Sequence, residues 1–198
     1  MIAIVDYGAG NLNSVKKAFD YLGAENIVTN NSDSLTAAEK IVLPGVGHFS
    51  SLRALSCSGM REALLRAVSA GRPLLGICLG MQWLFEGSEE CSEIAGAGFF
   101  PGKCRQFPPS VKSPHVGWNS LTVQASSRLL RGVAPDSFVY YTHSFHAPVV
   151  AAMVAGTEYG LHFAGAVEQD NIFGVQFHPE KSGDVGLSIL KNFSEVRC

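Results

Sequence analysis

Apolar and polar residues form two different patterns in the first half of the chain. Aliphatic runs without polar alternation are typical of strands covered on both faces, and we expect strands at 2–5, 26–29, 40–43 and 74–77. Between these runs, apolar residues recur at the spacing of an amphipathic helix, which predicts helices at 12–22, at 60–70 and from 79 to about 85. Glycines follow the first two helices and are expected to end them. This alternation indicates an α/β fold with a mostly parallel central sheet flanked by helices.

The second half of the chain changes character. Residues 87–114 are rich in Gly, Pro and Ser, which predicts long connections. After them we expect strands at 121–123, 138–142, 153–156, 161–168 and 172–177, and a last helix from about residue 184. The last two strands flank the polar residues 169–171, which is typical of a hairpin turn. Additional antiparallel strands are therefore expected beside the parallel sheet.

Composition narrows the class of protein. The 198 residues suffice for one domain with a sizeable core, so residues 1–198 are interpreted as a single domain. Apolar residues make up 46% and charged residues 16%, which suggests that a partner covers part of the surface. The net charge of −2 and the lack of a basic run argue against binding of nucleic acid or an anionic membrane. Because neither a basic leader nor a membrane-spanning apolar stretch is recognisable, we expect a cytoplasmic protein.

Five cysteines occur in the chain: Cys57, Cys78, Cys91, Cys104 and Cys198. Their number is odd, and their spacing fits neither a disulfide framework nor a zinc site. We therefore expect no metal and no cofactor. A buried cysteine is most often a small apolar residue without chemistry, but the neighbours of Cys78 indicate a nucleophile.

Cys78 stands where an apolar strand is expected to turn sharply into a helix. The order Gly76-Ile77-Cys78-Leu79-Gly80 is that of a nucleophile elbow with sulfur in place of a serine oxygen. Such a turn strains the backbone of the nucleophile, and side chains two residues to either side would collide, which accounts for Gly76 and Gly80. The turn also directs the following backbone N–H groups at the group under attack. This arrangement favours acyl transfer by Cys78.

A cysteine nucleophile needs a base, because only a few per cent of free thiol is ionised at neutral pH. Among the six histidines, His178 has the most informative neighbours, since Pro179 and Glu180 follow it directly. Residues i and i+2 of an extended chain share a face, and Pro179 biases His178 toward that conformation. His178 and Glu180 are therefore expected to point the same way from one strand end, where the carboxylate orients the imidazole. The sequence predicts a Cys78-His178-Glu180 triad.

Backbone amides have to stabilise the oxyanion that such an attack creates. The N–H of Leu79, directly after the nucleophile, is the expected first donor. The loop Gly45-Val46-Gly47 follows another strand, and the carboxyl ends of parallel strands face one site, so this loop is a candidate for the second donor. Gln82 lies one helical turn after Cys78, close enough to bind a small polar substrate; alternatively, it is a solvent-facing side chain.

These motifs resemble those of the triad-type, class I glutamine amidotransferases, over essentially the whole chain. The main segments are Gly76-Ile-Cys-Leu-Gly-Met-Gln82 and Gln176-Phe-His-Pro-Glu-Lys-Ser182. Within the superfamily, the chain is similar to the glutaminase subunits of imidazole glycerol phosphate synthases, through Asp6-Tyr-Gly-Ala-Gly-Asn11, Leu43-Pro-Gly-Val-Gly-His-Phe49, His115-Val-Gly-Trp-Asn119 and Tyr140-Tyr-Thr-His-Ser144. The resemblance implies a flavodoxin-like α/β fold, and no catalytic position departs from the family pattern.

The resemblance further implies hydrolysis of L-glutamine to glutamate and ammonia through a γ-glutamyl thioester on Cys78. It implies a switchable oxyanion donor in the glycine loop and substrate contacts from Gly47, Gln82, His143, Ser144 and Phe145. In this family, the ammonia passes to a separate (β/α)8-barrel cyclase subunit of a heterodimer, which makes imidazole glycerol phosphate and aminoimidazole carboxamide ribonucleotide in histidine biosynthesis. The residues implied to face that subunit are Asn11, Trp118, Asn119 and Lys181. The isolated chain is expected to hydrolyse glutamine poorly until the partner shifts the loop.

Other interpretations stay open at this point. Taken alone, Trp118 suits core packing, and Lys181 suits a solvated surface charge. The chain is alternatively the glutaminase of another synthase, in the pyridoxal phosphate, anthranilate or purine pathway, although the Pro-Gly-Val-Gly and His-Val-Gly-Trp-Asn segments disfavour this. The intact triad argues against a non-catalytic regulatory or scaffold domain. A cysteine peptidase is disfavoured because the sequence shows no obvious extended substrate groove.

Overall fold

The computed structural model describes residues 1–197, and Cys198 lies outside the described residues. Nine strands form one sheet in the order β2-β1-β3-β4-β12-β11-β10-β7-β8. Parallel pairing joins β2 (Asn26–Thr29), β1 (Ile2–Val5), β3 (Lys40–Leu43), β4 (Leu74–Ile77) and β12 (Ile172–Val175). Antiparallel pairing adds β11 (His162–Gln169), β10 (Met153–Glu158), β7 (His115–Val123) and β8 (Ser137–His143). The predicted α/β fold with added antiparallel strands is confirmed.

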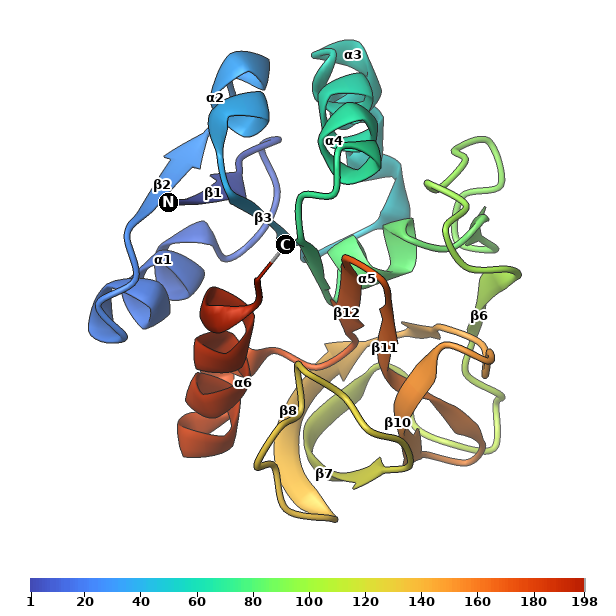
Figure 1. Ribbon diagram of the computed structural model, residues 1–198. Coiled ribbons are helices and arrows are strands. Elements are labelled where there is room, and N and C mark those ends of the chain that lie inside the picture. The colour runs from blue at the N-terminus through green and yellow to red at the C-terminus, as the bar shows by residue number, and fades with distance from the viewer. Residues whose placement is uncertain (198) are drawn as a thin grey trace.

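Helices cover both faces of the parallel strands (Figure 1). One face carries α1 (Leu12–Tyr21) and α6 (Gly183–Glu195), and the other carries α2 (Ser32–Ala37), α3 (Arg53–Cys57), α4 (Met60–Ser69) and α5 (Leu79–Trp83). Successive side chains of a strand point to opposite faces, so in β1 Ile4 packs with α1 and α6, while Ala3 and Val5 face the other helices. Burial on both faces is the reason that these strands lack polar alternation.

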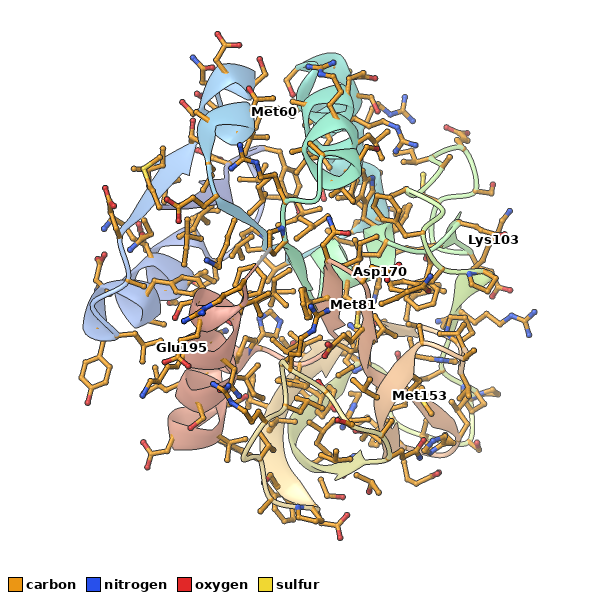
Figure 2. All side chains as sticks on the ribbon, in the orientation of Figure 1. Met60, Met81, Lys103, Met153, Asp170 and Glu195 are labelled. Atoms are coloured by element: carbon orange, nitrogen blue, oxygen red, sulfur yellow. The ribbon has the colours of Figure 1, made fainter. Side chains whose placement is uncertain are left out.

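The antiparallel strands β7, β8, β10 and β11 occupy the lower part of the molecule in Figure 1, beside α6. The smaller sheet contains β5 (Gly87–Ser88), β6 (Lys103–Gln106) and β9 (Phe145–His146). Two 3-10 turns, η1 (Phe49–Leu52) and η2 (Pro179–Lys181), follow β3 and β12 along the chain. Figure 2 shows Met81 of α5 in the middle of the molecule, where it is fully buried, and Lys103 at its outer edge.

Several short elements differ from the prediction. Helices α2 and α3 each bury one side chain, Leu35 and Leu55, so neither displays an apolar stripe in the sequence. Strands β5, β6 and β9 are only two to four residues long. Strand β7 begins at His115 rather than at residue 121, because exposed Val116 and Trp118 on its outward face hide the alternation. The predicted hairpin turn at 169–171 is present between β11 and β12.

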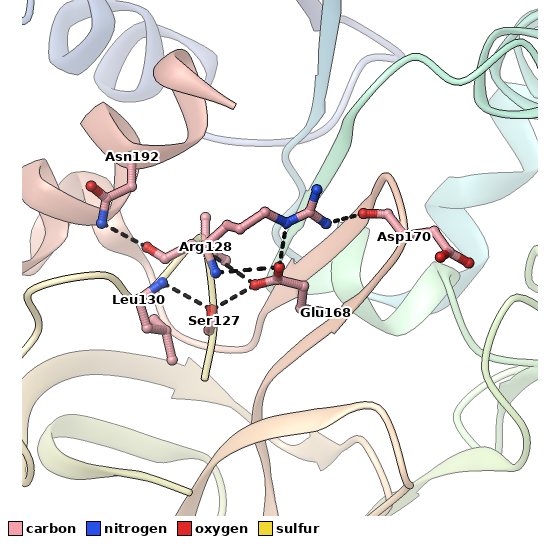
Figure 3. Close-up of polar contacts among 7 residues, drawn as sticks. Ser127, Arg128, Leu130, Glu168, Asp170 and Asn192 are labelled. Carbon is pink, nitrogen blue, oxygen red and sulfur yellow. Dashed lines mark hydrogen bonds and ion pairs between the residues drawn. The ribbon is translucent and has the colours of Figure 1, made fainter. Parts of the chain in front are cut away.

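A polar network fastens the loop between β7 and β8 to the rest of the fold (Figure 3). Glu168, near the end of β11, accepts hydrogen bonds from Ser127 Oγ at 2.6 Å and from Arg128 Nε at 2.7 Å. Burial opposes the ionisation of Glu168, but these donors outweigh it and lower the pKa of the carboxyl group. Asn192 of α6 donates to the carbonyl oxygen of Leu129 at 2.9 Å. The loop is therefore anchored to both the sheet and the last helix.

No helix within residues 1–197 is long and apolar enough to cross a bilayer. The same residues contain no cluster of three or more His, Cys, Asp or Glu side chains that could hold a metal ion. Four cysteines of this part of the chain are free thiols: Cys57, Cys78, Cys91 and Cys104.

Candidate active site

Cys78 lies at the apex of a sharp turn between β4 and α5. Its backbone has φ 53° and ψ −105°, a conformation that residues with a side chain rarely adopt. A Cβ atom at Gly76 would lie 2.6 Å from the carbonyl oxygen of Gly80, and one at Gly80 would overlap the carbonyl oxygen of Leu43. Both positions therefore require glycine, as the sequence predicts for a nucleophile elbow.

His178 and Glu180 form a buried pair next to this turn. Nδ1 of His178 lies 2.9 Å from Oε1 of Glu180, and both side chains are 1% exposed. The predicted geometry of this pair is wrong in one respect, because β12 ends at Val175 and Glu180 lies in the 3-10 turn that begins at Pro179. Proline suits the first position of a helical turn, since its φ is preset and its missing N–H is not needed there. The two side chains meet through a turn, not through alternation along a strand.

Strand β8 fixes the position of His178. The N–H of His178 donates to the carbonyl oxygen of Tyr140 at 2.8 Å. The hydroxyl of Ser182 donates to the carbonyl oxygen of His178 at 2.7 Å and accepts a hydrogen bond from the N–H of Tyr140 at 3.0 Å. These bonds hold the imidazole on a rigid support, as a catalytic base requires.

The charges of Cys78 and Glu180 decide the protonation of His178. Burial opposes a charged imidazole, but the Cys78 thiolate and the Glu180 carboxylate outweigh burial and raise the pKa of His178 well above its ordinary value. Nε2 of His178 is buried and has no hydrogen-bond partner within residues 1–197. Nε2 of Gln176 donates to Sγ of Cys78 at 3.7 Å. The site therefore favours the charged form of the His178 imidazole.

One of the expected oxyanion donors is already engaged in a hydrogen bond with the loop of Gly45, half-buried Val46 and Gly47. The N–H of Leu79 donates to the carbonyl oxygen of Gly45, with 3.4 Å between the two atoms. A Cβ at Gly45 would overlap the hydroxyl of Tyr7 and lie 2.8 Å from Cβ of Leu79, whereas Gly47 has φ 99° and open space around it. Gly45 thus allows the close approach of the loop, and Gly47 its unusual backbone conformation. The Gly45 carbonyl has to turn away before the Leu79 N–H can face an oxyanion.

Cys78 lines a cavity of about 270 Å³. This cavity brings together residues that are distant in sequence and were predicted to form the site: Gly47, Cys78, Leu79, Gln82, His143, Ser144 and Phe145. Gln82 is buried, which excludes the solvent-facing alternative. Its Nε2 donates to the carbonyl oxygen of Phe145 at 2.7 Å and to Oε1 of Gln176 at 3.3 Å. Gln82 therefore shapes the cavity wall by holding the Phe145 carbonyl group.

His143 borders the cavity with both ring nitrogens engaged inside the chain. Its Nδ1 lies 2.8 Å from the carbonyl oxygen of Phe145, and its Nε2 lies 3.3 Å from Nδ1 of His115. Burial lowers the pKa of His143 to about 3, so the ring is neutral near pH 7. A contact between His143 and a substrate would therefore involve the edge of the ring and not a free nitrogen.

Glu90 is a cavity residue that the sequence analysis missed. Its Oε2 accepts a hydrogen bond from the N–H of Phe49 at 2.7 Å. Among the described residues that line the cavity, Glu90 is the one carboxylate, and a carboxylate is a strong partner for a substrate ammonium group. Glu90 lies in the irregular segment 87–114, where neither periodicity nor a motif distinguishes one acidic residue from the next.

An exposed aromatic face lies on the outer side of β7 and β8. Trp118 is 55% exposed and packs edge to face on Tyr140, with 6.1 Å between ring centroids. Nζ of Lys181 lies 5.8 Å from the centre of the Tyr140 ring. Asn119 points to the opposite side of β7, where its Nδ2 donates to the carbonyl oxygen of Glu158 at 2.9 Å. Trp118 thus lies on the surface and not in the core, and Asn119 is engaged within the chain.

Comparison with known proteins agrees with this geometry. The family model described as glutamine amidotransferase class-I matches residues 3–196. The chain therefore belongs to the class I glutamine amidotransferases, a family to which the fold and the cysteine elbow also point.

Closer relatives narrow the family further. The chain is 47% identical over 197 residues to imidazole glycerol phosphate synthase subunit HisH of Methanothermobacter thermautotrophicus, covering 99% of this chain and 98% of the relative. It is 46% identical to the subunits of the same name from Bacillus cereus, with 99% and 95% covered, and from Chlorobium luteolum, with 98% and 100% covered. Within its class, the chain belongs to the HisH family.

More distant proteins share the fold. A structure described as a glutamine amidotransferase is 17% identical, with a TM-score of 0.78 over 99% of this chain and 100% of that one. The glutaminase domain of Trypanosoma brucei CTPS is also 17% identical, with a TM-score of 0.67 over 100% of this chain and 94% of that one. At such identities the likeness shows the fold alone.

Proposed function

We propose that this chain is the glutaminase subunit of an imidazole glycerol phosphate synthase and hydrolyses L-glutamine to glutamate and ammonia. The observation that carries this proposal is the buried pair of His178 and Glu180, which lies close enough to Cys78 for the cysteine to raise the pKa of His178. Cys78 itself lines a cavity of about 270 Å³. Membership of the HisH family supports the same reaction.

The triad performs the reaction in two stages. In the first, His178 takes the thiol proton of Cys78, and the sulfur attacks the side-chain amide carbon of glutamine. His178 then gives its proton to the leaving nitrogen, so the C–N bond breaks and ammonia departs. In the second, His178 removes a proton from water, which attacks the γ-glutamyl thioester and releases glutamate and the Cys78 sulfur. Glu180 orients the imidazole and stabilises its charged form throughout.

The cavity walls match the two ends of a glutamine molecule. Glu90 lines the cavity and offers a carboxylate to the α-ammonium group of glutamine. Gly47, His143, Ser144 and Phe145 contribute to the wall, and Gln82 holds the Phe145 carbonyl in place. A second oxyanion donor comes from the loop Gly45-Val46-Gly47 after its peptide turns, in addition to the N–H of Leu79.

The partner in this proposal is a (β/α)8-barrel cyclase subunit, with which the chain forms a heterodimer. The relatives' name, subunit of a synthase, supports a partner subunit. We assign the docking surface to Trp118 and Lys181, because their side chains gather around Tyr140 on the outer face of β7 and β8. Asn11, at the start of α1, is assigned to the same surface. Asn119 contributes by supporting β7 from within.

The ammonia is consumed by the partner in histidine biosynthesis. It joins a ribulosyl aminoimidazole carboxamide nucleotide, and the products are imidazole glycerol phosphate and aminoimidazole carboxamide ribonucleotide. A glutaminase that is inactive until the acceptor nucleotide binds wastes no glutamine. The hydrogen bond from the Leu79 N–H to the Gly45 carbonyl oxygen is consistent with such control, because it keeps an oxyanion donor engaged.

Ammonia release from glutamine tests the proposal, measured for the purified chain alone, with the cyclase subunit, and with the cyclase and its nucleotide. We expect the last mixture to be the most active. A Cys78→Ala variant should lose glutamine-dependent synthesis and keep synthesis from an added ammonium salt. Loss of both activities would contradict the division of labour between the subunits.

The alternatives predict different outcomes. Activation by the synthase of the pyridoxal phosphate, anthranilate or purine pathway, and not by the cyclase, would favour another glutaminase assignment. A non-catalytic domain would not be labelled at Cys78 by a glutamine-analogue electrophile. Cleavage of peptides by the purified chain would favour a cysteine peptidase.

A further inference from the structure

Two buried histidines outside the triad face each other across strands β7 and β8. His115 and His143 are partners in the strand register, and both are buried. The ring of His115 is stacked between Tyr141 and Tyr159, with centroid distances of 4.8 and 3.9 Å. The triad uses neither histidine, although His143 borders the glutamine cavity.

The hydrogen bonds determine which ring nitrogens carry protons. Nδ1 of His143 faces the carbonyl oxygen of Phe145, which only accepts, so this nitrogen carries a proton. In a neutral ring Nε2 is then an acceptor, and its partner, Nδ1 of His115, has to donate. By the same reasoning, Nε2 of His115 accepts from the Nδ2 amide group of Asn119 at 3.4 Å. From Asn119 through His115 and His143 to the Phe145 carbonyl group, each donor therefore faces an acceptor.

Neutral rings are consistent with the surroundings of both histidines. Burial lowers the pKa of His115 to about 4 and that of His143 to about 3. Near pH 7 neither ring is charged, so neither competes with His178 for a proton. We therefore expect the two histidines to contribute by holding neighbouring groups in place, and not by transferring protons.

This chain of bonds ends on the cavity wall. The carbonyl oxygen of Phe145 accepts from Nδ1 of His143 and also from Nε2 of Gln82, at 2.8 and 2.7 Å. Gln82 in turn donates to Oε1 of Gln176, whose Nε2 donates to Sγ of Cys78 at 3.7 Å. The tautomer of His143 therefore influences the Phe145 peptide and, through Gln82 and Gln176, the surroundings of the nucleophile.

We propose that His115 is a positioning residue for glutamine binding: its Nδ1–H donates to Nε2 of His143 and holds that ring in the orientation in which its own Nδ1–H fixes the Phe145 carbonyl group on the wall of the cavity. The proposal rests on the proposed glutaminase function. Without the donor from His115, Nε2 of His143 is a buried acceptor without a partner. Nε2 then regains a partner only if the ring rotates, and such rotation weakens the bond from Nδ1 to the Phe145 carbonyl oxygen.

Two substitutions of His115 separate hydrogen bonding from packing. His115→Phe keeps a ring between Tyr141 and Tyr159 but has no donor. His115→Asn places an amide N–H near the position of Nδ1 and restores the donor to His143 without the ring. The control His162→Phe removes a histidine that pairs with Glu158 outside the cavity.

Kinetics of the complex with the cyclase provide the first test. We expect His115→Phe to raise KM for glutamine about tenfold with kcat within about threefold of wild type, because one buried hydrogen bond is worth about tenfold. His115→Asn should lie within about threefold of wild type in KM, and synthesis from an ammonium salt should be unchanged in all variants. Equal KM values for His115→Phe and His162→Phe would overturn the proposal, as would an equal increase in His115→Asn.

Nitrogen-15 NMR of histidine-labelled chain provides a test that needs no activity. All three chains should show His143 as the neutral Nδ1–H tautomer at pH 7, with an Nδ1 proton that exchanges slowly with solvent in the wild type and in His115→Asn and faster in His115→Phe. Equal exchange rates in the wild type and His115→Phe would overturn the proposal. A protonated or Nε2–H His143 in the wild type would overturn the proposal. If the wild-type complex releases no ammonia from glutamine, the proposed function fails, while the NMR result still judges the tautomer. Thermal unfolding of each variant identifies any that fails to fold, and His115→Asn then carries the NMR comparison.

Discussion

The backbone N–H of Leu79 points at the carbonyl oxygen of Gly45, with 3.4 Å between nitrogen and oxygen. The same N–H follows the nucleophile and is the first donor expected for an oxyanion. Loss of one such donor costs about 10²–10³ in rate. We expect the isolated chain to release ammonia from glutamine about 10²–10³ times more slowly than the complex with cyclase and nucleotide, measured by steady-state kinetics. Equal rates would contradict a role for the loop as a switch.

The close approach of Gly45 to the elbow leads to a prediction about stability. A Cβ at this position would overlap the Tyr7 hydroxyl and crowd Cβ of Leu79, so Gly45→Ala should lower the free energy of unfolding by about 1–3 kcal/mol. The Tyr7 hydroxyl is buried without a hydrogen-bond partner in the described residues. Tyr7→Phe should therefore cost little alone and recover part of the loss in the double variant. Strictly additive effects in urea unfolding would contradict the predicted overlap.

The strained backbone of Cys78 predicts that the geometry of the nucleophile lowers the free energy of unfolding. At φ 53° and ψ −105° a side chain is disfavoured, and relief of such strain is worth about 1 kcal/mol or more. Neither Cys78→Gly nor Cys78→Ala can attack glutamine, but we expect Cys78→Gly to be the more stable by about 1 kcal/mol. Thermal unfolding compares them, with Gly59→Ala as a control for strain at a left-handed glycine outside the site. A less stable Cys78→Gly variant would show that the turn is not strained.

Much of this molecule could be predicted because its motifs are local. The elbow at 76–80 combines a buried strand, two glycines and a nucleophile within five residues, and the strands of the parallel sheet are apolar runs. The structure places Cys78 and His178 after β4 and β12, two parallel neighbours whose carboxyl ends face one edge of the sheet. The His178 and Glu180 contact was predicted from an extended chain, but Pro179 starts a turn that brings the two side chains together in another way.

One cavity residue and two orientations could not be predicted, because they depend on tertiary contacts without a local pattern. Glu90 lies in a long irregular segment, and only the folded chain brings it to the cavity. Asn119 directly follows exposed Trp118, yet the pleat of β7 turns its amide group inward to His115 and Glu158. The orientation of the Gly45 carbonyl depends on a peptide plane, and glycine leaves that angle open.

Trp118 leads to a prediction about the partner. Its side chain is more than half exposed and packs on one neighbouring ring, so Trp118→Ala should leave the thermal stability of the isolated chain nearly unchanged. An exposed tryptophan at the centre of an interface contributes about 2 kcal/mol, or about 30-fold in Kd for the cyclase. Tyr21→Ala removes an exposed aromatic residue from the end of α1 and is the matched control. Equal Kd values for both variants, measured by titration calorimetry, would contradict the proposed docking surface.

Glu180 leads to a prediction about pH dependence. The pKa of His178 is raised in the folded chain above its ordinary value of 6.5, so the imidazolium persists as pH rises through neutrality. The stability that it contributes is fully present below pH 6.5 and is lost as pH rises through the raised pKa. Glu180→Gln keeps the shape but removes the negative charge, so the pKa of His178 falls. We expect the basic limb of kcat/KM against pH to move to lower pH in this variant, with Glu158→Gln, which pairs with His162, as the control. An unmoved basic limb would mean that Glu180 orients His178 without stabilising its charge.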